Sequence, residues 1–262
     1  MAISAQAGIL KVCADPNNLP FSNRQGDGFE NKLAQLIAGD LRDSVRYTWW
    51  AQRRGYVRNT IKAGHCDAWL GVATGTDMLA TTRPYYRSSY VFVTRKDRSL
   101  IIRSLDDPRL RTLRIGVQMV GDDAMNTPPA HALARRGIVD NVRGYMVYGD
   151  YNRPDPERAI LDDVENGRLE IAMVWGPVAG YFAAVEPSPL AITPIEPSVD
   201  GGVWPMEFDV SVGVKHGDPA FKHMIQKALD RHQQDIIMLL TSYRVPQFPI
   251  EASKAAAPPT SK

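Results

Sequence analysis

Few side chains in this sequence have the types and spacing that catalysis or metal binding would require. Five histidines are present, at positions 65, 131, 216, 223 and 232. Their spacing matches no common metal motif, and no Ser–His–Asp arrangement, Walker loop or G-x-G-x-x-G fingerprint follows a predicted strand. Asp122 and Asp123 stand side by side after Gly121, but two carboxylates are too few to hold a hard cation. The residues therefore predict neither an enzyme, nor a metal site, nor a cofactor.

Four polar residues are candidates for binding instead. Asn17 and Asn18 follow the first predicted strand, where open α/β sheets bind their ligands, although both are also common turn residues. Asp122 precedes a predicted helix and serves either the cleft or the helix N-terminus. Arg83 stands before Pro84 at the start of a long strand, and its side chain either reaches the cleft or is solvated.

The elements that would position these residues are arranged around residues 83–94. After Arg83 and Pro84 this stretch consists largely of aromatic and β-branched residues, and towards its end both faces are apolar. That pattern indicates a buried strand. One α/β unit precedes it and another follows, so we expect it to cross between two lobes, beside a cleft.

The two units share one plan. Strands are predicted at residues 10–14, 45–49 and 66–72 in the first unit and at 113–117, 142–148 and 169–175 in the second. Helices begin near Phe29, Tyr56, Pro128 and Pro177, and the second of them is expected to continue through Ile61 towards Gly64. This alternation is typical of parallel sheets flanked by helices. Residues 208–214 alternate as a second crossing strand, and the helices that follow should pack on the first lobe.

The sequence therefore predicts an α/β protein of two lobes, each a parallel-type sheet flanked by helices, joined by two crossing strands. The first lobe comprises residues 8–94 and 208–250, and the second comprises residues 95–207. Residues 251–262 are rich in Ala, Pro, Ser and Lys and are expected to be a disordered tail. The alternative is a single doubly wound sheet.

Composition narrows the classes of partner. The 262 residues carry a formal net charge of +2, which is too little for an electrostatic footprint on nucleic acid or on a membrane surface. No apolar run approaches the ~20 residues of a spanning helix. The N-terminal Ala5-Gln6-Ala7 is either the remnant of a signal peptide cleavage site or part of an ordinary frayed terminus.

The order of several short motifs resembles the type 2 periplasmic binding proteins, in particular those that bind amino acids. The motifs are Pro20-Phe21-Ser22 after the first strand, Gly28-Phe29 before the first helix, and Pro84-Tyr85-Tyr86 at the crossing. Longer blocks resemble a subfamily, the quinoprotein-dehydrogenase-associated binding proteins of the MxaJ/XoxJ type. These blocks lie at residues 12–22, 47–50, 52–55, 81–88, 116–118, 121–123, 128–133, 149–151 and 174–177.

The resemblance implies a monomeric periplasmic accessory protein. Proteins of this type support the assembly or activation of a PQQ-dependent methanol dehydrogenase, and the resemblance implies that enzyme as the partner, with its cytochrome c as a further candidate. An oxidising periplasm also implies that Cys13 and Cys66 pair, since their predicted strands are neighbours in a 2-1-3 order. Whether the register of the two strands allows the bond is left open.

The sequence departs from the amino-acid binders at both charged anchors. Residues 74–79 lack the arginine that grips the ligand carboxylate in that family, and Trp175 stands where an aspartate usually receives the ligand ammonium. We therefore predict an aromatic cleft without affinity for amino acids. Its candidate residues are Phe21, Trp49, Trp50, Tyr85, Tyr86 and Trp175. For Trp49, Tyr86 and Trp175 a core position is the alternative.

Three functions compete at this point. The first is an interaction protein that docks on a methanol dehydrogenase, and the second is the receptor of an ABC importer for an uncharged or aromatic ligand. The third is an enzyme on the same scaffold, such as a dehydratase, which would require a buried acid or base in the cleft. No paired carboxylates in the sequence indicate the third.

Overall fold

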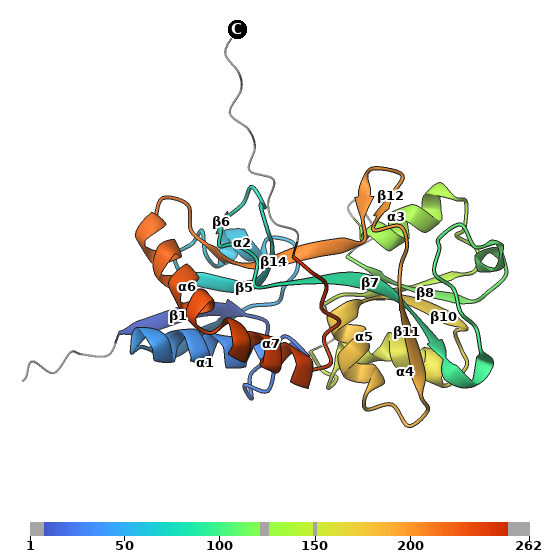
Figure 1. Cartoon of the computed structure of the whole chain (residues 1–262), viewed down its shortest axis with the longest axis horizontal. Helices are drawn as coiled ribbons and strands as arrows, with labels where there is room; N and C mark the ends of the chain where they lie inside the picture. The colour runs from blue at the N-terminus through green and yellow to red at the C-terminus, as the bar shows by residue number, and fades with distance from the viewer. Residues whose placement is uncertain (1–7, 121–125, 149–150, 251–262) are drawn as a thin grey trace, which may run out of the picture.

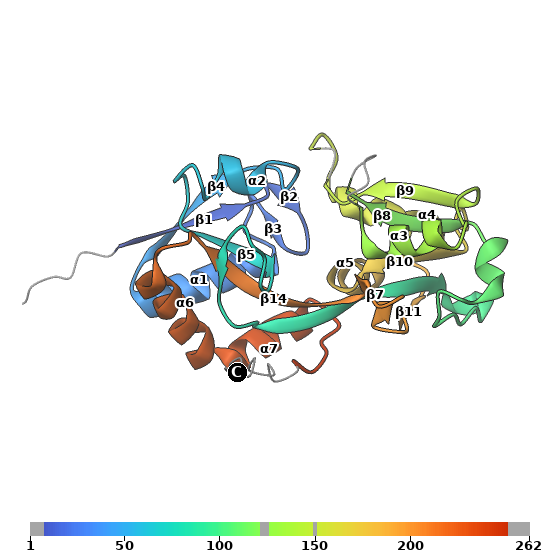
Figure 2. The same ribbon diagram turned by 90° about the horizontal axis from the view of Figure 1, so that it is seen from above.

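The computed structural model describes residues 8–120, 126–148 and 151–250. Two α/β lobes lie side by side along the long axis of the molecule, and two long strands run between them (Figures 1 and 2). The β2 (Asn17–Asn18) and β3 (Ser22–Asn23) pair lies at the first lobe (Figure 2), and the β12 (Val199–Asp200) and β13 (Trp204–Pro205) pair lies at the second (Figure 1). The two-lobed α/β prediction is confirmed.

The first lobe is built on a mixed sheet in the order β4-β1-β5-β14. Its parallel strands are β1 (Ile9–Ala14), β4 (Ser44–Trp49) and β5 (Ala68–Ala73). One face of the sheet packs against α1 (Phe29–Leu41), α6 (Pro219–Arg231) and α7 (Gln233–Ser242). Because α6 and α7 come from the end of the chain, this packing brings both ends of the sequence together on one sheet.

The opposite face of this sheet carries the disulfide. Cys13 and Cys66 are bonded, with their Cα atoms 5.5 Å apart, and both are buried beside α2 (Tyr56–Asn59) and Ile61. The predicted pairing is therefore confirmed. The helix here is shorter than expected, because the chain leaves the α conformation at Thr60 and continues as hydrogen-bonded turns to Gly64.

The second lobe repeats the 2-1-3 strand order. Strands β8 (Ile115–Met119), β9 (Val142–Met146) and β10 (Ile171–Trp175) are parallel, with β8 in the middle. Helices α3 (Pro128–Arg135), α4 (Ala159–Glu165) and α5 (Gly176–Ala183) provide its covering layers. The sequence patterns did not predict β11 (Leu190–Pro194), which pairs antiparallel with the crossing strand.

The crossing strands are β7 (Tyr86–Arg95) and β14 (Glu207–Val214). The first half of β7 pairs with β14 and its second half pairs with β10, and the change occurs between Ser89 and Tyr90. Short strand β6 (Ala80–Thr81) pairs with β14. The crossing strands thus join the strands of both lobes into one ten-stranded sheet. The lobe boundaries after residues 94 and 207 remain a proposal.

The segment after α7 forms a third connection between the lobes. The Ser88 hydroxyl donates to the carbonyl of Pro246 at 2.7 Å, and the Phe248 N–H donates to the carbonyl of Arg87 at 3.0 Å. The same segment packs on α5, where an added Cβ at Gly180 would overlap the carbonyl oxygen of Arg244. The absence of a side chain at Gly180 therefore lets the segment approach the second lobe.

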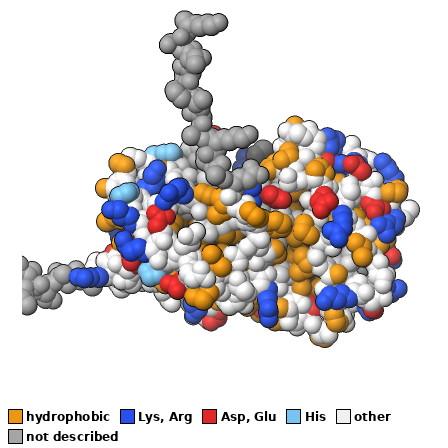
Figure 3. All heavy atoms as spheres, viewed as in Figure 1, with side chains coloured by type: hydrophobic (Ala, Val, Ile, Leu, Met, Phe, Trp, Pro, Cys, Tyr) orange, Lys and Arg blue, Asp and Glu red, His pale blue; other side chains and the backbone are white. Residues whose placement is uncertain are grey.

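Side-chain types are unevenly spread on the face shown in Figure 3. Hydrophobic side chains gather in the middle of this face, where β7, β14 and the segment after α7 lie in Figure 1. Acidic and basic side chains are interspersed over both lobes. This mixture agrees with the small net charge of +2.

Candidate functional site

A cavity of about 340 Å³ lies between the lobes, and we call it the interlobe cavity. It is bounded by the carboxyl ends of parallel strands from both sheets, which is where open α/β sheets bind ligands. The crossing strands form its floor. Its lining residues are Asn18, Phe21, Glu30, Gln52, Gly71, Ala73, Tyr86, Tyr90, Gln118, Val120, Thr127, Val147, Glu157, Trp175, Val178, Phe208 and Val210.

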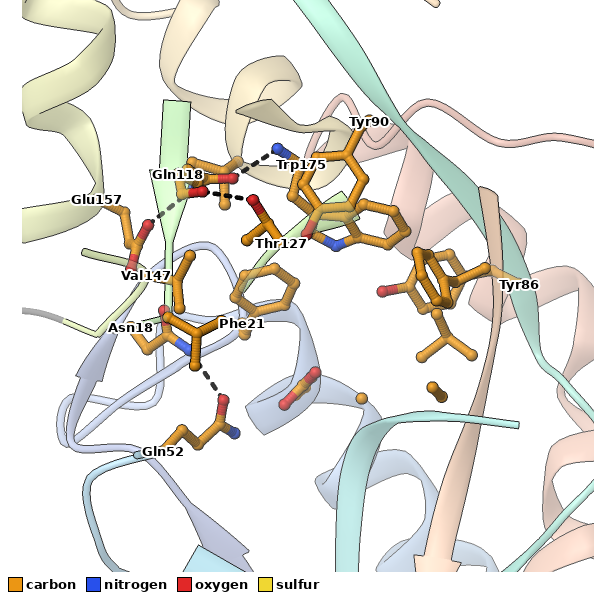
Figure 4. A pocket seen from close by; sticks show the side chains of 17 residues that line it. Asn18, Phe21, Gln52, Tyr86, Tyr90, Gln118, Thr127, Val147, Glu157 and Trp175 are labelled. Atoms are coloured by element: carbon orange, nitrogen blue, oxygen red, sulfur yellow. Dashed lines mark hydrogen bonds between the residues drawn. The ribbon is translucent and has the colours of Figure 1, made fainter. Parts of the chain in front are cut away.

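Gln118 organises the second-lobe side of the interlobe cavity (Figure 4). It is the fourth residue of β8, and its side chain is buried. Its Nε2 donates to Glu157 Oε2 at 3.0 Å, while its Oε1 accepts from the Trp175 N–H at 2.7 Å. Its backbone carbonyl accepts from the Thr127 hydroxyl at 2.5 Å. One amide side chain therefore connects a strand end, the start of α5 and the loop that carries Glu157.

Aromatic side chains form much of the cavity wall. The ring of Trp175 lies 5.2 Å from that of Tyr90 and 5.9 Å from that of Phe208, both on the crossing strands. Phe21 packs edge-on against Phe29 of α1, which in turn packs edge-on against Tyr86. These T-shaped and tilted contacts hold the rings in place, so the wall is largely preformed.

Two buried carboxyl groups face the cavity from opposite lobes. Glu30 lies in the first turn of α1, and Glu157 lies in the short 3-10 helix Pro156–Arg158. Burial in apolar surroundings, with a smaller contribution from the negative charge of Asp15, raises the pKa of Glu30 to about 8. Burial likewise raises the pKa of Glu157 to about 8, although the Gln118 amide opposes this rise. Both carboxyl groups are therefore mostly protonated at pH 7.

Hydrogen bonds across the cleft mouth join the two lobes. The Tyr151 hydroxyl donates to Asp15 Oδ2 at 2.6 Å, and the Asn17 side-chain amide donates to the carbonyl of Arg153 at 2.8 Å. Asp15 is held in turn by the backbone N–H groups of Asn17 and Gln52. The structure therefore shows the lobes in contact at the mouth, with the interlobe cavity behind them.

Four of the predicted site residues line the interlobe cavity. They are Asn18, Phe21, Tyr86 and Trp175. Asn18 donates to Gln52 Oε1 at 3.2 Å, and the Trp175 ring also packs against the cores of both lobes. For Tyr86 and Trp175 the structure thus combines the two readings left open by the sequence, because each packs in the core and also borders the cavity.

The other predicted residues lie elsewhere. Asn17 is at the cleft mouth. Trp49 stacks on Tyr47 with ring centroids 4.6 Å apart, and Trp50 beside it is 41% exposed. Tyr85 packs against the first-lobe core, with its ring 5.0 Å from that of Tyr86.

Of the two remaining predicted residues, only Arg83 lies within the described part of the chain. Arg83 points to the surface and forms a bidentate ion pair with Asp230 at 2.7 and 2.8 Å, so the solvated reading describes its position. Asp122 lies outside the described residues.

The sequence patterns did not identify Glu30, Tyr90, Gln118, Glu157 and Phe208 as site residues. Gln118 directly follows the predicted strand 113–117. Because open α/β sheets bind ligands at the carboxyl ends of their strands, this position indicated a site residue. Tyr90 shares the parity of Tyr86 on the crossing strand, which was a usable signal. Glu30 follows Phe29 at the beginning of the apolar helix stripe, whereas Glu157 stands in an unpatterned polar loop that gave no signal.

The described residues contain neither a cluster of metal ligands nor a membrane-spanning helix. Within residues 8–120, 126–148 and 151–250, no three His, Cys, Asp or Glu side chains are grouped as metal ligands. No helix in the same ranges has the length and hydropathy needed to cross a membrane.

Comparison with known proteins places this geometry among binding proteins. Residues 10–238 match the model of the bacterial extracellular solute-binding proteins, family 3. The chain is 30% identical to protein MoxJ of Methylorubrum extorquens over 95% of this chain and 85% of that protein. It is also 30% identical to protein MoxJ of Paracoccus denitrificans over 92% of this chain and 89% of that protein.

Solved structures are similar in the same way. The periplasmic binding protein XoxJ from Methylobacterium extorquens AM1 is 34% identical, with a TM-score of 0.74 over 92% of this chain and 100% of that one. MxaJ from Methlophaga aminisulfidivorans MPT is 25% identical, with a TM-score of 0.79 over 91% of this chain and 100% of that one. The fold is therefore that of the type 2 periplasmic binding proteins, as predicted.

Proposed function

This chain belongs to family 3 of the bacterial extracellular solute-binding proteins, and on that premise we propose that it is a periplasmic accessory protein for a PQQ-dependent methanol dehydrogenase. The observation that carries the proposal is the near full-length similarity to MoxJ, MxaJ and XoxJ. The quinoprotein-dehydrogenase-associated subfamily, which the sequence blocks resemble, supplies the partner. The protein acts by binding, without catalysis of its own.

The disulfide supports the proposed compartment. Cys13 and Cys66 are both buried and bonded to each other, and such bonds persist in oxidising compartments such as the bacterial periplasm. A periplasmic location also fits a family of extracellular solute-binding proteins. Secretion of the chain is testable by fractionating cells and locating the oxidised form.

The cavity chemistry argues against an amino-acid receptor. The described residues that line the interlobe cavity include no Arg, Lys or His, so an α-carboxylate would enter beside Glu30 and Glu157 without a cationic partner. We expect no common amino acid to bind more tightly than about 1 mM, which corresponds to about 4 kcal/mol of binding free energy. Calorimetry against the common amino acids measures this, and a micromolar dissociation constant would contradict it.

We place the docking region at the cleft mouth. Trp50 follows β4 at the carboxyl edge of the first sheet, next to Gln52 of the cavity lining, and it is 41% exposed. Exposed tryptophans are over-represented among residues that dominate interface affinity. A polypeptide segment of the dehydrogenase would contact this edge and the aromatic side chains behind it. A transient accessory complex requires only a small interface.

The test is co-purification of the dehydrogenase from the native periplasm with wild type and two variants. Trp50→Ala should reduce recovery of the dehydrogenase at least about tenfold, as expected for loss of a hot-spot residue. Ile9→Ala is the matched control, because Ile9 is 47% exposed but lies at the opposite end of β1 from the cleft. Equal recovery with both variants would place docking on another surface. Failure of the wild type to recover dehydrogenase after gentle crosslinking would reject the accessory role.

The aromatic cavity keeps one alternative in consideration. A receptor for an importer of an uncharged or aromatic ligand would use the same rings of Tyr90, Trp175 and Phe208 as its binding wall. The crosslinking experiment separates the two functions, since a receptor would recover an importer permease in place of a dehydrogenase.

A further inference from the structure

We propose that the interlobe cavity, whose aromatic wall carries the buried carboxyl groups of Glu30 and Glu157, binds a small organic ammonium ion. This inference goes beyond the accessory role, because it concerns a small ligand of the protein itself. Its basis is the burial of the two carboxyl groups, an unsatisfied polar atom and the composition of the cavity wall.

The strongest indication is a carboxyl oxygen without a hydrogen-bond partner. Glu157 is 5% exposed, and its Oε2 accepts from Gln118 at 3.0 Å. Its Oε1 is buried and has no hydrogen-bond partner among the described residues. Buried polar atoms in native proteins are almost always paired, so an unpaired carboxyl oxygen bordering a cavity indicates a missing partner. An N–H group of a ligand supplies that partner once the carboxyl group has lost its proton.

A second carboxyl group approaches from the other lobe. Glu30 is 6% exposed and borders the same cavity. Its carboxyl group lies against Gly71, where an added Cβ would overlap Glu30 Oε1. The lack of a side chain at Gly71, which has a φ of +79°, therefore provides the room that this carboxyl group occupies.

The rest of the wall suits an organic cation. The rings of Phe21, Tyr86, Tyr90, Trp175 and Phe208 line the cavity. Aromatic faces attract cations through their quadrupole and also accept an apolar body. The volume of about 340 Å³ is at the lower end of the range for small-molecule sites. An ammonium group on a short alkyl or arylalkyl body matches these features, whereas a carboxylate or a large ligand does not.

Charge balance points to the same ligand class. No lining residue among those described is a cation, so nothing in the wall neutralises the two carboxyl groups. With both pKa values raised to about 8, the empty cavity holds protonated carboxyl groups at pH 7. Binding of an ammonium favours the ionised carboxylate and releases a proton to solvent. Affinity should therefore rise as the pH increases to about 8 and level off until the amine itself loses its proton near pH 10.

Other titratable groups around these carboxyl groups do not reverse the expected rise of ammonium affinity with pH. Those that interact with Glu157 are Asp15, Tyr90 and Tyr151. Those that interact with Glu30 are Asp15, Tyr47, Tyr56, Tyr85 and Tyr86. The negative charge of Asp15 raises both carboxyl pKa values, and burial raises the pKa of each tyrosine, so all these tyrosines stay neutral at pH 8.

The experiment is calorimetric titration of the full chain with butylammonium and phenethylammonium, using 1-butanol and 2-phenylethanol as neutral counterparts of similar shape. We expect each ammonium to bind at least about tenfold more tightly than its alcohol at pH 8. Between pH 6 and pH 8 its affinity should rise about fiftyfold, because the ionised fraction of a carboxyl group with a pKa of about 8 rises from about 1% to about 50%. Titrations in buffers of different ionisation enthalpy should show protons released at pH 7.

Isosteric variants assign the effect to the two residues. Glu157→Gln and Glu30→Gln should each weaken ammonium binding about tenfold or more and reduce the proton release, while leaving the weak binding of the alcohols unchanged. Glu170→Gln is the control, because Glu170 pairs with Arg114 on the outer side of the second lobe. This control should match the wild type in every titration.

Two results would overturn the proposal. One is equal affinity for an ammonium and its alcohol in the wild-type protein. The other is the lack of ammonium binding at up to about 10 mM at pH 8. Both comparisons use the wild type, so they decide the question even if a variant fails to fold. Because neither result involves a dehydrogenase, failure of this proposal can be distinguished from failure of the accessory role.

Discussion

At the scale of single residues, Gln118 shows how one buried amide positions a binding site. Its two polar atoms are both used, one by Glu157 and the other by the backbone of Trp175. An amide is suited to this place because it donates and accepts at once. A carboxylate there could not donate a hydrogen bond to Glu157, and a hydrophobic residue would leave the Glu157 carboxyl group without its hydrogen bond from Gln118.

The two raised carboxyl pKa values predict a specific pH dependence of stability. In the unfolded chain Glu30 and Glu157 should have their ordinary pKa of 4.5, while in the folded protein each has a pKa of about 8. The folded protein therefore retains the two carboxyl protons to a higher pH than the unfolded chain does. As a result the free energy of unfolding falls as pH rises from about 4.5 to about 8, by about 1.4 kcal/mol per pKa unit for each group. Above pH 8 this contribution should be constant.

Glu157→Gln isolates half of this effect. The variant keeps the size of the side chain but cannot ionise. Its free energy of unfolding should therefore equal that of the wild type near pH 5 and exceed it near pH 8 by a few kcal/mol, which is the loss that ionisation of Glu157 causes in the wild type. Urea unfolding at several pH values provides the measurement. Glu170→Gln should follow the wild-type curve, and a wild type whose stability rises between pH 5 and pH 8 would contradict the raised pKa values.

At the scale of elements, two helical glycines should respond oppositely to the same substitution. Gly180→Ala in α5 would push against the carbonyl of Arg244 and displace the segment that crosses between the lobes, so we expect a loss of about 1–3 kcal/mol. Gly39→Ala in α1 is the matched variant, because an added Cβ there meets nothing within 4 Å. It should stabilise the protein by up to about 1 kcal/mol.

Chemical denaturation of both glycine variants provides the comparison. The opposite signs matter more than the magnitudes, since helix propensity alone would make both changes stabilising. A Gly180→Ala protein as stable as Gly39→Ala would mean that the segment after α7 does not pack on α5 in solution.

The Cys13–Cys66 disulfide links β1 to the residues that directly precede β5. The two residues are separated by 53 positions in the sequence, and the chain-entropy account of loop closure predicts a stabilisation of about 4 kcal/mol. Replacing both cysteines by Ala should lower the free energy of unfolding by that order. Labelling the unfolded, unreduced wild type with a thiol reagent should detect no free thiol, and labelling of both cysteines would contradict the bond.

At the scale of the whole molecule, the contacts at the cleft mouth should influence how far the lobes separate. Tyr151 of the second lobe donates to Asp15 of the first, so Tyr151→Phe removes one interlobe hydrogen bond. Loss of this hydrogen bond should reduce the free-energy preference for the closed arrangement by about 1 kcal/mol, or by more because the acceptor is charged. The population of open molecules should rise roughly fivefold.

Small-angle X-ray scattering of the free protein measures that shift as a larger radius of gyration. Tyr148→Phe is the control, since the Tyr148 hydroxyl makes no hydrogen bond within the described residues. Identical scattering from Tyr151→Phe and Tyr148→Phe would show that the hydroxyl of Tyr151 does not hold the lobes together.

Local patterns along the chain were enough to predict the architecture. Alternating strand and helix patterns identified both units, the aromatic stretch after Arg83 identified β7, and the alternation at residues 208–214 identified β14. Such patterns are readable because each is a local consequence of burying one face of an element. The chain order of these elements also placed α6 and α7 on the first lobe, and it placed Asn18, Phe21 and Trp175 at strand ends.

The set of side chains that meet in the interlobe cavity, in contrast, depends on the folded chain. Glu30 and Glu157 are 127 positions apart, so no local pattern relates them, and their raised pKa values arise from burial that exists only in the folded chain. Arg83 was expected at either of two places, and its ion pair with Asp230 of α6 depends on how the end of the chain folds back. Local sequence patterns report burial along an element, whereas charge, hydrogen bonding and cavity shape depend on contacts between distant elements, which only folding brings together.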